Sequence, residues 1–430
     1  MTYQDRLLNA IPGGAHTYSR GFDQYPSNAP QILHKGEGAY VYDNEGNRFL
    51  DYGMALRAVN LGYANENVNK AAIEQILNGN NLTRASIIEL EAAELLIDMI
   101  PNVDMVKFTK NGSTATTAAV KLARAYTNRT LVARCIEHPF FSYDDWFIGS
   151  TEIKKGIPKN DIENTKLFHY NDIESLEELF NKYPNEIACV ILEPASTEHP
   201  KENFLHKVRD ICHKNRAIFI LDEMITGFRW HLQGAQKYYD IEADLVTYGK
   251  AMANGFSVSA IAGKREIMSL GSIEEKEKER MFLLSTTHGA EMCGLGAFVQ
   301  TMKFMKKNNV VSHLWDYGKK LVKLMNELAY KYEIEKSFIA SGIECSPYYL
   351  TLNKDGKNCL GLRTLFAQEM IKNGVLIPWI ALSYAHKKEE LDFTKKALEE
   401  SFKVYKKAFN EGYEEYLHGE VIKPVFRRYN

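Results

Sequence analysis

The stretch DLVTYGKAMANG, residues 244–255, places a lysine at the end of a run of core-type residues. Residues 245–248 are apolar or aromatic, with Thr247 contributing its methyl group, and they predict a buried strand. Lys250 follows between a glycine and an alanine. A buried ammonium group is costly unless it is paired, neutralised or used covalently. The position therefore suggests covalent chemistry, although a lysine that reaches solvent or pairs with a carboxylate fits the same pattern.

Similar short runs rich in β-branched residues alternate with helical stretches from about residue 50 to residue 300. Residues 201–215 form an amphipathic helical pattern between two of these runs. A repeated strand–helix–strand order predicts βαβ units and an open, largely parallel sheet, hence an α/β fold. The expected strands are TLVARC (130–135), IACVILEP (187–194), AIFILDE (217–223), DLVTYGK (244–250) and SAIAGK (259–264).

The pattern changes after about residue 305. A long amphipathic helix, about 310–332, precedes the strand-like runs SPYYLTLN and GVLIPWIA and a final helix over 387–416. We therefore expect a large domain over 49–305 and a smaller α+β domain over 306–430, which the N-terminal segment 1–48 joins. Two local features are also expected: a hairpin in 38–52 and a solvated loop at the charged run 271–280.

Composition excludes several classes of function. The 430 residues include 53 basic and 55 acidic side chains, a net charge of −2 that does not attract nucleic acid. No apolar run approaches a membrane span, and the six cysteines are scattered without a CxxC pair. We expect a soluble cytoplasmic protein with reduced thiols and no membrane partner. A metal site is not expected, because the histidines lack ligand spacing, as at His16, His138, His288 and His386.

Three further features converge with Lys250 on one cofactor. Asp222 ends a predicted strand 28 residues earlier, where it is either a cap or a buried anion that faces a cation such as a protonated pyridine nitrogen. Gly112 and Ser113 begin an alanine-rich helix, whose start either binds a phosphate or is a plain N-cap. The hydroxyl-rich stretch 282–291 alone resembles a turn. Together they supply an amine, an acid and phosphate-binding loops, the attachments that pyridoxal 5′-phosphate (PLP) needs.

The sequence resembles the class III aminotransferases of fold type I, and among them the glutamate-1-semialdehyde aminomutases, over nearly its whole length. The resemblance rests on motifs in the same order as in that family. These are IPGGAHTYSRGF (11–22), NGSTATTAAVKLAR (111–124), ILDEMITGFR (220–229), YGKAMANGFSVSAIAGKREIM (248–268), STTHGAEMCGLGA (285–297) and LSYAHKKEELD (382–392). The family fold implies a mostly parallel seven-stranded sheet flanked by helices, plus a smaller α+β domain.

The resemblance also implies roles for individual residues. Lys250 would hold PLP as a Schiff base, and Asp222 would keep its ring nitrogen protonated. Gly112 and Ser113 would bind the phosphate, and Thr286 would reach the phosphate from the neighbouring subunit of a homodimer. Phe140 would stack on one face of the ring and Met224 would pack on the other. On the substrate side, the implied residues are Thr17, Arg20 and Glu198.

Departures from the family pattern surround the implied substrate pocket. Thr114 replaces a family glutamate, FFSYDDW (140–146) replaces a Tyr-His-Gly run, and EPASTEHP (193–200) puts Glu198 where an asparagine is usual. DYGMALRAV (51–59) lacks the family tryptophan. We therefore expect an aminotransferase with an amino-acid donor such as glutamate and a changed aldehyde or ketone acceptor, a carbohydrate or nucleotide-sugar precursor being one candidate. An intramolecular aminomutase is the alternative, and a silent relative with a binding role is a third hypothesis.

Overall fold

The computed structural model describes residues 1–274, 277 and 279–429, so part of the charged run 271–280 lies outside the described residues. The chain divides into two compact units. The central unit comprises residues 66–308 and 426–430, and the terminal unit comprises residues 1–65 and 309–425.

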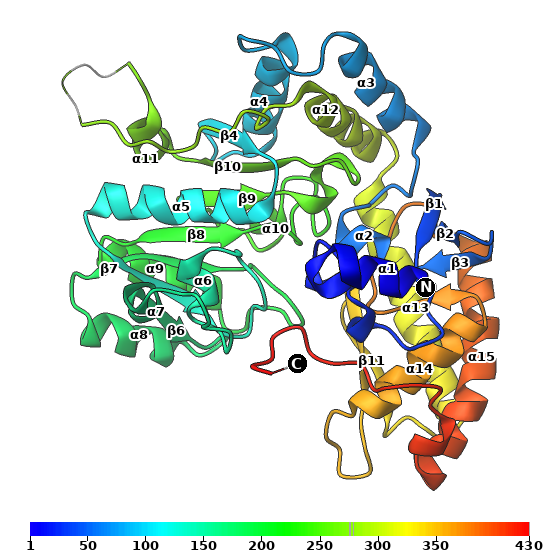
Figure 1. Ribbon diagram of the computed structural model, residues 1–430. Helices are drawn as coiled ribbons and strands as arrows, with labels where there is room; N and C mark the ends of the chain where they lie inside the picture. The colour runs from blue at the N-terminus through cyan, green and yellow to red at the C-terminus, as the bar shows by residue number, and fades with distance from the viewer. Residues whose placement is uncertain (275–276, 278, 430) are drawn as a thin grey trace. The chain divides into compact units, whose positions relative to one another are not determined.

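A seven-stranded sheet organises the central unit (Figure 1), in the order β4-β10-β9-β8-β7-β5-β6. β10 runs antiparallel to its neighbours β4 and β9, and the remaining pairs are parallel. The predicted mostly parallel sheet is therefore confirmed, with β10 as the one reversed strand. The strands are β4 (Met105–Thr109), β5 (Leu131–Cys135), β6 (Thr165–Phe168), β7 (Ile187–Leu192), β8 (Ile218–Asp222), β9 (Leu245–Tyr248) and β10 (Ser259–Gly263).

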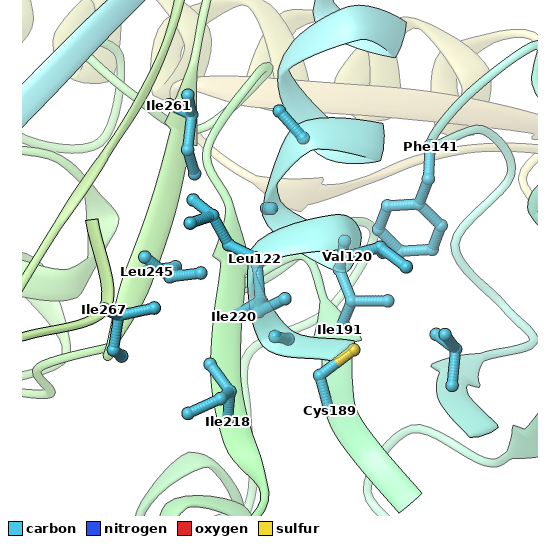
Figure 2. Close-up of a cluster of buried hydrophobic side chains, with 14 of the residues drawn as sticks. Val120, Leu122, Phe141, Cys189, Ile191, Ile218, Ile220, Leu245, Ile261 and Ile267 are labelled. Atoms are coloured by element: carbon cyan, nitrogen blue, oxygen red, sulfur yellow. The ribbon is translucent and has the colours of Figure 1, made fainter. Parts of the chain in front are cut away.

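Both faces of this sheet are buried, because every residue of β5, β7, β8, β9 and β10 is buried. Successive strand residues point to opposite faces. Ile220 and Ile191 therefore face α5 (Gly112–Thr127), where Val120 and Leu122 pack beside them (Figure 2). The intervening residues face the other side of the sheet, where α9 (Phe204–Lys214) packs on β8. Near-continuous apolar strands are typical of sheets covered by helices on both faces.

The other helices of the central unit are short connections or form a group with α12. They are α3 (Glu66–Leu77), α4 (Ile87–Met99), α6 (Asp145–Ile148), α7 (Lys159–Asn164), α8 (Ile173–Lys182), α10 (Ala235–Tyr238), η4 (Lys250–Ala253), α11 (Arg265–Met268), η5 (Ser269–Gly271) and α12 (Met292–Lys307). Helix α12 packs against α3 and α4.

The terminal unit is α+β. Its four-stranded sheet has the order β1-β2-β3-β13, in which β2 and β3 form the expected hairpin, and β11 pairs with β12 separately. The strands are β1 (Leu33–Glu37), β2 (Tyr40–Asp43), β3 (Arg48–Asp51), β11 (Phe338–Ile343), β12 (Ser346–Thr351) and β13 (Val375–Leu376). The helices are α1 (Tyr3–Ala10), η1 (Pro12–Gly14), η2 (Tyr18–Arg20), η3 (Phe22–Gln24), α2 (Met54–Arg57), α13 (Val310–Lys331), α14 (Leu360–Lys372), α15 (Lys388–Glu411) and η6 (Glu414–Tyr416).

The two units begin and end close to the expected domain boundaries without coinciding with them. Strand β3 hydrogen-bonds to β2 and β13, which places residues 49–65 with the terminal unit. At the other end, residues 426–430 belong to the central unit. Within the described chain, none of the helices combines the length and the apolar character needed to cross a bilayer.

Candidate active site

Three chain segments of the central unit leave the sheet at the same edge. The register pairs Asp222 with Thr247 at the ends of β8 and β9, and Ser259 of β10 pairs with Thr109 at the end of β4. Helix α5 starts three residues after β4 ends. Ligands of open α/β sheets bind at the carboxyl ends of the parallel strands. The structure thus brings Asp222, Lys250 and the start of α5 to the edge where a site is expected.

Asp222 is a buried carboxylate held in a fixed orientation. Its Oδ1 accepts from the Met224 N–H at 3.0 Å and from the Thr247 hydroxyl at 2.9 Å. Burial raises the pKa of Asp222 to about 6, while the positive charge of Lys250 acts in the opposite direction. Because both hydrogen bonds reach Oδ1, Oδ2 can accept from a further donor. A protonated ring nitrogen satisfies that geometry and lowers the cost of the buried charge.

Lys250 begins η4 with a backbone φ of +44°, an uncommon conformation for a residue other than glycine. Gly249 before it lies against Met224, since a methyl group at Gly249 would fall 2.5 Å from the Met224 sulfur. The same sulfur would lie 2.8 Å from a methyl group at Gly112. Met224 therefore packs between the two predicted cofactor segments, and a side chain at either glycine would displace the end of Met224.

The start of α5 has the features of a phosphate site. Asn111 is the N-cap, and its side chain accepts from the Thr114 N–H at 2.9 Å. The N–H groups of Gly112 and Ser113 lie in the first turn of α5, where helix geometry leaves N–H groups without an intrahelical acceptor. Free N–H groups and the positive end of the helix dipole favour a phosphate. The N-cap and phosphate interpretations are thus compatible, because different N–H groups serve each.

Phe140 lies in the loop that departs from the family motif. Its ring is 45% exposed and meets Phe147 edge-on at 5.6 Å. The loop is tied to α5, because the Thr116 hydroxyl donates to the Phe141 carbonyl at 2.7 Å and the Tyr143 N–H donates to Ser113 Oγ at 3.2 Å. An exposed ring on a fixed loop can stack on a planar ligand.

Thr286 is exposed on a loop that hydrogen bonds join to neighbouring segments of the central unit. Asn81 donates to the Thr287 carbonyl at 3.1 Å, and Asn80 donates to the Glu291 carboxylate at 2.9 Å. Lys110, adjacent to the α5 cap, forms an ion pair with Glu291. The loop is therefore fixed to the central unit, while Thr286 faces outward.

The predicted substrate residues lie in two places. Thr17 and Arg20 share one turn of the terminal unit, closed by the Arg20 N–H on the Thr17 carbonyl at 2.9 Å, and the Arg20 side chain is exposed. Glu198 belongs to the central unit, where it is exposed and pairs with Lys201 at 2.6 Å. Among the described residues no contact joins Glu198 to Asp222 or Lys250.

Two other acidic positions have structural roles. Glu223 is fully buried and accepts the Ala235 and Gln236 N–H groups at 2.7 and 2.8 Å, and burial raises its pKa to about 7. Asp144 accepts from the Thr117 hydroxyl. Glu223 thus holds the turn after β8, and Asp144 holds the Phe140 loop.

Thr247 is the site residue that sequence reasoning missed. It counted only as an apolar strand position through its methyl group, yet its hydroxyl orients Asp222. The available signal was its alternation with Leu245, which places both side chains on one face of the sheet beside the Asp222 strand.

The donor set fits PLP chemistry better than metal chemistry. No cluster of three or more histidine, cysteine or acidic side chains that could hold a metal ion exists in the described chain. The edge instead combines one amine, one buried carboxylate with an open oxygen and a helix start with free N–H groups. These groups match the aldehyde, ring nitrogen and phosphate of PLP.

Comparison with known proteins agrees with this chemistry. The sequence profile of the family described as Aminotransferase class-III matches residues 23–403. A glutamate-1-semialdehyde 2,1-aminomutase of Francisella philomiragia is 31% identical over 412 residues, covering 90% of this chain and 94% of that protein. A 3-aminobutyryl-CoA aminotransferase of Cloacimonas acidaminovorans is 30% identical over 420 residues, covering 95% and 97%.

Solved structures show the same fold. The PLP internal aldimine form of the Sphingopyxis FumI protein superposes with a TM-score of 0.86 at 24% identity, covering 95% of this chain and 97% of that one. A glutamate-1-semialdehyde aminomutase of Pseudomonas aeruginosa gives 0.81 at 18% identity, covering 94% of each. The predicted family, fold and cofactor are confirmed: the chain belongs to the class III aminotransferases, which are PLP-dependent enzymes of fold type I.

Proposed function

We propose that this enzyme transfers an amino group from an amino-acid donor, glutamate in the first place, to an aldehyde or ketone acceptor. The observation that carries the proposal is the position of Asp222 at the end of β8 and of Lys250 just after the adjacent strand β9, where the positive charge of Lys250 acts on the Asp222 carboxylate, beside the N–H groups at the start of α5. Bound PLP supplies an electron sink for the bond broken at the donor Cα. The remaining tasks fall to side chains of this chain.

Lys250 has two tasks in the proposed reaction. Its amine would hold the cofactor through the cofactor aldehyde at rest, and as a free amine it would accept the proton from the donor Cα. Asp222 keeps the ring nitrogen protonated, and Thr247 and the Met224 N–H keep Asp222 in place. Gly112 and Ser113 bind the phosphate, and Phe140 and Met224 contact the two ring faces.

We assign substrate selection to two groups of residues. One is the turn that carries Arg20, an arginine also present in the family pattern, and the other is the set of segments that depart from that pattern. Arg20 binds the donor carboxylate, with Thr17 in the same turn, because an exposed arginine suits bidentate carboxylate binding. Glu198 and the Phe140 loop face the acceptor. The polar substitutions around the predicted pocket, Glu198 among them, favour a hydroxylated acceptor such as a carbohydrate or nucleotide-sugar precursor.

The test follows each half-reaction by absorbance. Purified holoenzyme mixed with L-glutamate, without an acceptor, is expected to lose its yellow colour and release stoichiometric 2-oxoglutarate. Carbonyl compounds are then screened for recovery of the colour. Arg20→Ala is expected to raise the KM for glutamate and not for a donor without the second carboxylate. An enzyme that releases no 2-oxoglutarate, yet isomerises an amino aldehyde without a donor, is an aminomutase, and the transaminase proposal is then wrong.

We further propose that the enzyme acts as a cytoplasmic homodimer in which Thr286 contacts the phosphate of the neighbouring site. Support comes from exposed apolar side chains on α3, α4 and the turn between them, which also carries the Asn80 and Asn81 contacts to the Thr286 loop. The six free cysteines suit a reducing compartment. The apolar residues are Ile73, Ile76, Leu77, Leu82, Ile87 and Leu90.

A charge placed in this apolar surface tests the dimer. Leu77 is 81% exposed, and Leu77→Asp is expected to shift the sedimentation coefficient from dimer to monomer and to lower PLP affinity. Tyr330→Asp, at a 74% exposed aromatic of the terminal unit, serves as the control and should remain dimeric. A Leu77→Asp protein that stays dimeric places the subunit interface elsewhere.

A further inference from the structure

The last residues of the chain lie beyond the region that the family profile matches. The match ends at residue 403, and α15 ends at Glu411. The chain then continues to residue 430, and residues 426–430 belong to the central unit, which holds the candidate active site. Nothing in the family assignment therefore explains why the chain end packs on this unit.

Phe426 is the residue through which the chain end packs. Its ring is partly buried against the main hydrophobic cluster and meets Phe147 edge-on, with the ring centres 6.3 Å apart and the planes at 79°. Phe147 in α6 is only 1% exposed. The chain end therefore supports a core side chain rather than lying loosely on the surface.

Phe147 also contacts the ring that is assigned to the cofactor. Phe140 meets Phe147 at 5.6 Å and 75°, and Phe141 meets it at 5.8 Å and 80°. The Arg134 guanidinium stacks on Phe147 at 5.0 Å. Phe147 thus contacts both Phe140 and Phe426. Because both rings contact Phe147, a change at Phe426 is transmitted to Phe140 through that ring.

The other end of the loop is already fixed. Thr116 binds the Phe141 carbonyl, and Ser113 binds the Tyr143 N–H, so the backbone on either side of Ser142 follows the start of α5. Phe140 precedes these anchors and is 45% exposed, with Phe147 as its aromatic support. The orientation of the Phe140 ring consequently depends on how firmly Phe147 is held.

We propose that Phe426 is a positioning residue of the active site: it acts through Phe147 to hold the Phe140 ring in its stacking orientation. The inference rests on the proposed function, because it takes Phe140 as the ring that stacks on PLP. It makes the C-terminal segment, residues 426–429, a support of the site wall that lies beyond the region matched by the family profile. An aromatic edge contact of this kind is worth about a three- to tenfold change in an equilibrium constant.

The test compares Phe426→Ala with Phe426→Leu and with the control Tyr429→Ala, at a 75% exposed aromatic in the same segment. PLP is titrated into each apo-protein, and the visible circular dichroism of the bound cofactor is recorded. Phe426→Ala is expected to weaken PLP binding about three- to tenfold and to change the dichroism. Phe426→Leu, which keeps the apolar contact, should lie between Phe426→Ala and wild type, and Tyr429→Ala should match wild type.

A double-mutant cycle then tests whether the effect passes through Phe140. If it does, Phe426→Ala has little further effect on PLP affinity in a Phe140→Ala background. The proposal is overturned if both Phe426 variants bind PLP with wild-type affinity and dichroism while their thermal midpoints fall, because Phe426 is then only a fold anchor. Additive effects in the cycle also overturn it. Failure of the proposed function is distinct, since the wild-type holoenzyme mixed with L-glutamate would then release no 2-oxoglutarate.

Discussion

Two regions of the molecule retain a feature that costs folding free energy. One is the edge at the ends of β8 and β9 in the central unit, and the other is the turn over residues 53–57 in the terminal unit. At the edge, the buried carboxyl of Asp222 has a pKa raised to about 6. In the turn, Met54, Ala55, Leu56 and Arg57 all have positive φ values between 39° and 68°. One region thus keeps a costly charge and the other keeps a costly backbone.

The two costs differ in how the sequence accounts for them. The edge lies within motifs that match the family, and the proposed binding of PLP would account for its buried carboxylate and the nearby lysine. The turn lies in DYGMALRAV, where the chain departs from the family. Left-handed backbone costs roughly 1–2 kcal/mol for each residue other than glycine and persists at sites where the surrounding structure holds it. The proposed cofactor therefore accounts for the cost at the edge and not for the cost at the turn.

The largest expected effect comes from Lys250→Ala. The loss of the amine removes both the covalent attachment of PLP and the proton carrier, so turnover should fall roughly 10³-fold or more. The yellow colour that borohydride reduces should also disappear, as measured by absorbance and by mass spectrometry of the reduced protein. Lys237→Ala, at an exposed lysine of α10, is the matched control and should keep both. A reducible bond that survives in Lys250→Ala would assign the attachment to another lysine.

Asp222→Asn separates the effect of the Asp222 charge on activity from its effect on the stability of the apo-protein. The Asn oxygen can accept the two hydrogen bonds that now reach Oδ1, so the fold is kept while the negative charge is lost. Activity should fall roughly 10²-fold or more, because the ring nitrogen loses its charge partner. The apo-protein should instead gain stability at neutral pH. Urea unfolding of the apo-protein between pH 4 and pH 7 measures this gain.

The sign of that pH dependence follows from the pKa of Asp222. The folded value of about 6 lies above the ordinary value of 3.8, so the unfolded chain releases this proton first. Asp222 therefore removes stability as pH rises from about 4 to 6, by up to about 3 kcal/mol, and Asp222→Asn removes that loss. A stability difference that does not change with pH would contradict the assignment.

Glu223→Gln provides the contrast within the same turn. Glu223 uses both oxygens, accepting Gln236 N–H at Oε1, and Ala235 N–H and the Thr226 hydroxyl at Oε2. A glutamine amide cannot accept at both ends, so a buried donor is left unsatisfied at a cost of roughly 1–3 kcal/mol. Adjacent carboxylates should thus respond with opposite signs: Asp222→Asn stabilises the apo-protein and Glu223→Gln destabilises it.

The sequence predicted the cofactor edge and most strands of the central sheet, but it did not predict the left-handed turn. Apolar runs bounded by turns indicated β5, β7, β8, β9 and β10, and motif order indicated the cofactor edge. Strands β4 and β6 were not singled out, because β4 carries Lys107 and β6 carries Lys166 within four or five residues. GVLIPWIA is a strand only at Val375–Leu376, since Pro378 cannot donate to a ladder. The left-handed turn and the Phe426 contact had no local pattern, because tertiary contacts impose both.

The turn itself is stabilised by a buried network. Asp51 accepts the N–H groups of Gly53 at 2.7 Å and Met54 at 3.0 Å. The Tyr63 hydroxyl donates to Asp51 at 2.6 Å and accepts the Ala55 N–H at 2.8 Å. These bonds explain how the left-handed turn persists. They do not remove its backbone cost, which a glycine should relieve.

The smallest expected effect compares two alanines of this turn. Ala55 has φ 48° and ψ 48°, whereas Ala58, at the end of the turn, has φ −85° and ψ −11°. Ala55→Gly relieves left-handed strain and should raise the free energy of unfolding by about 0.5–1 kcal/mol. Ala58→Gly relieves nothing and should lower it by a similar amount through chain entropy. Urea unfolding measures the difference, about 1–2 kcal/mol in total.

The activity of Ala55→Gly decides what the strain is for. A more stable variant with a raised KM for its acceptor means that the rigid left-handed turn shapes the substrate wall, at the expense of stability. Because Ala55 and Ala58 differ in φ and not in side chain, the loss of one methyl group cannot produce opposite signs. Equal losses of stability in both variants would show that the turn is not strained, and the parallel with the cofactor edge would fail.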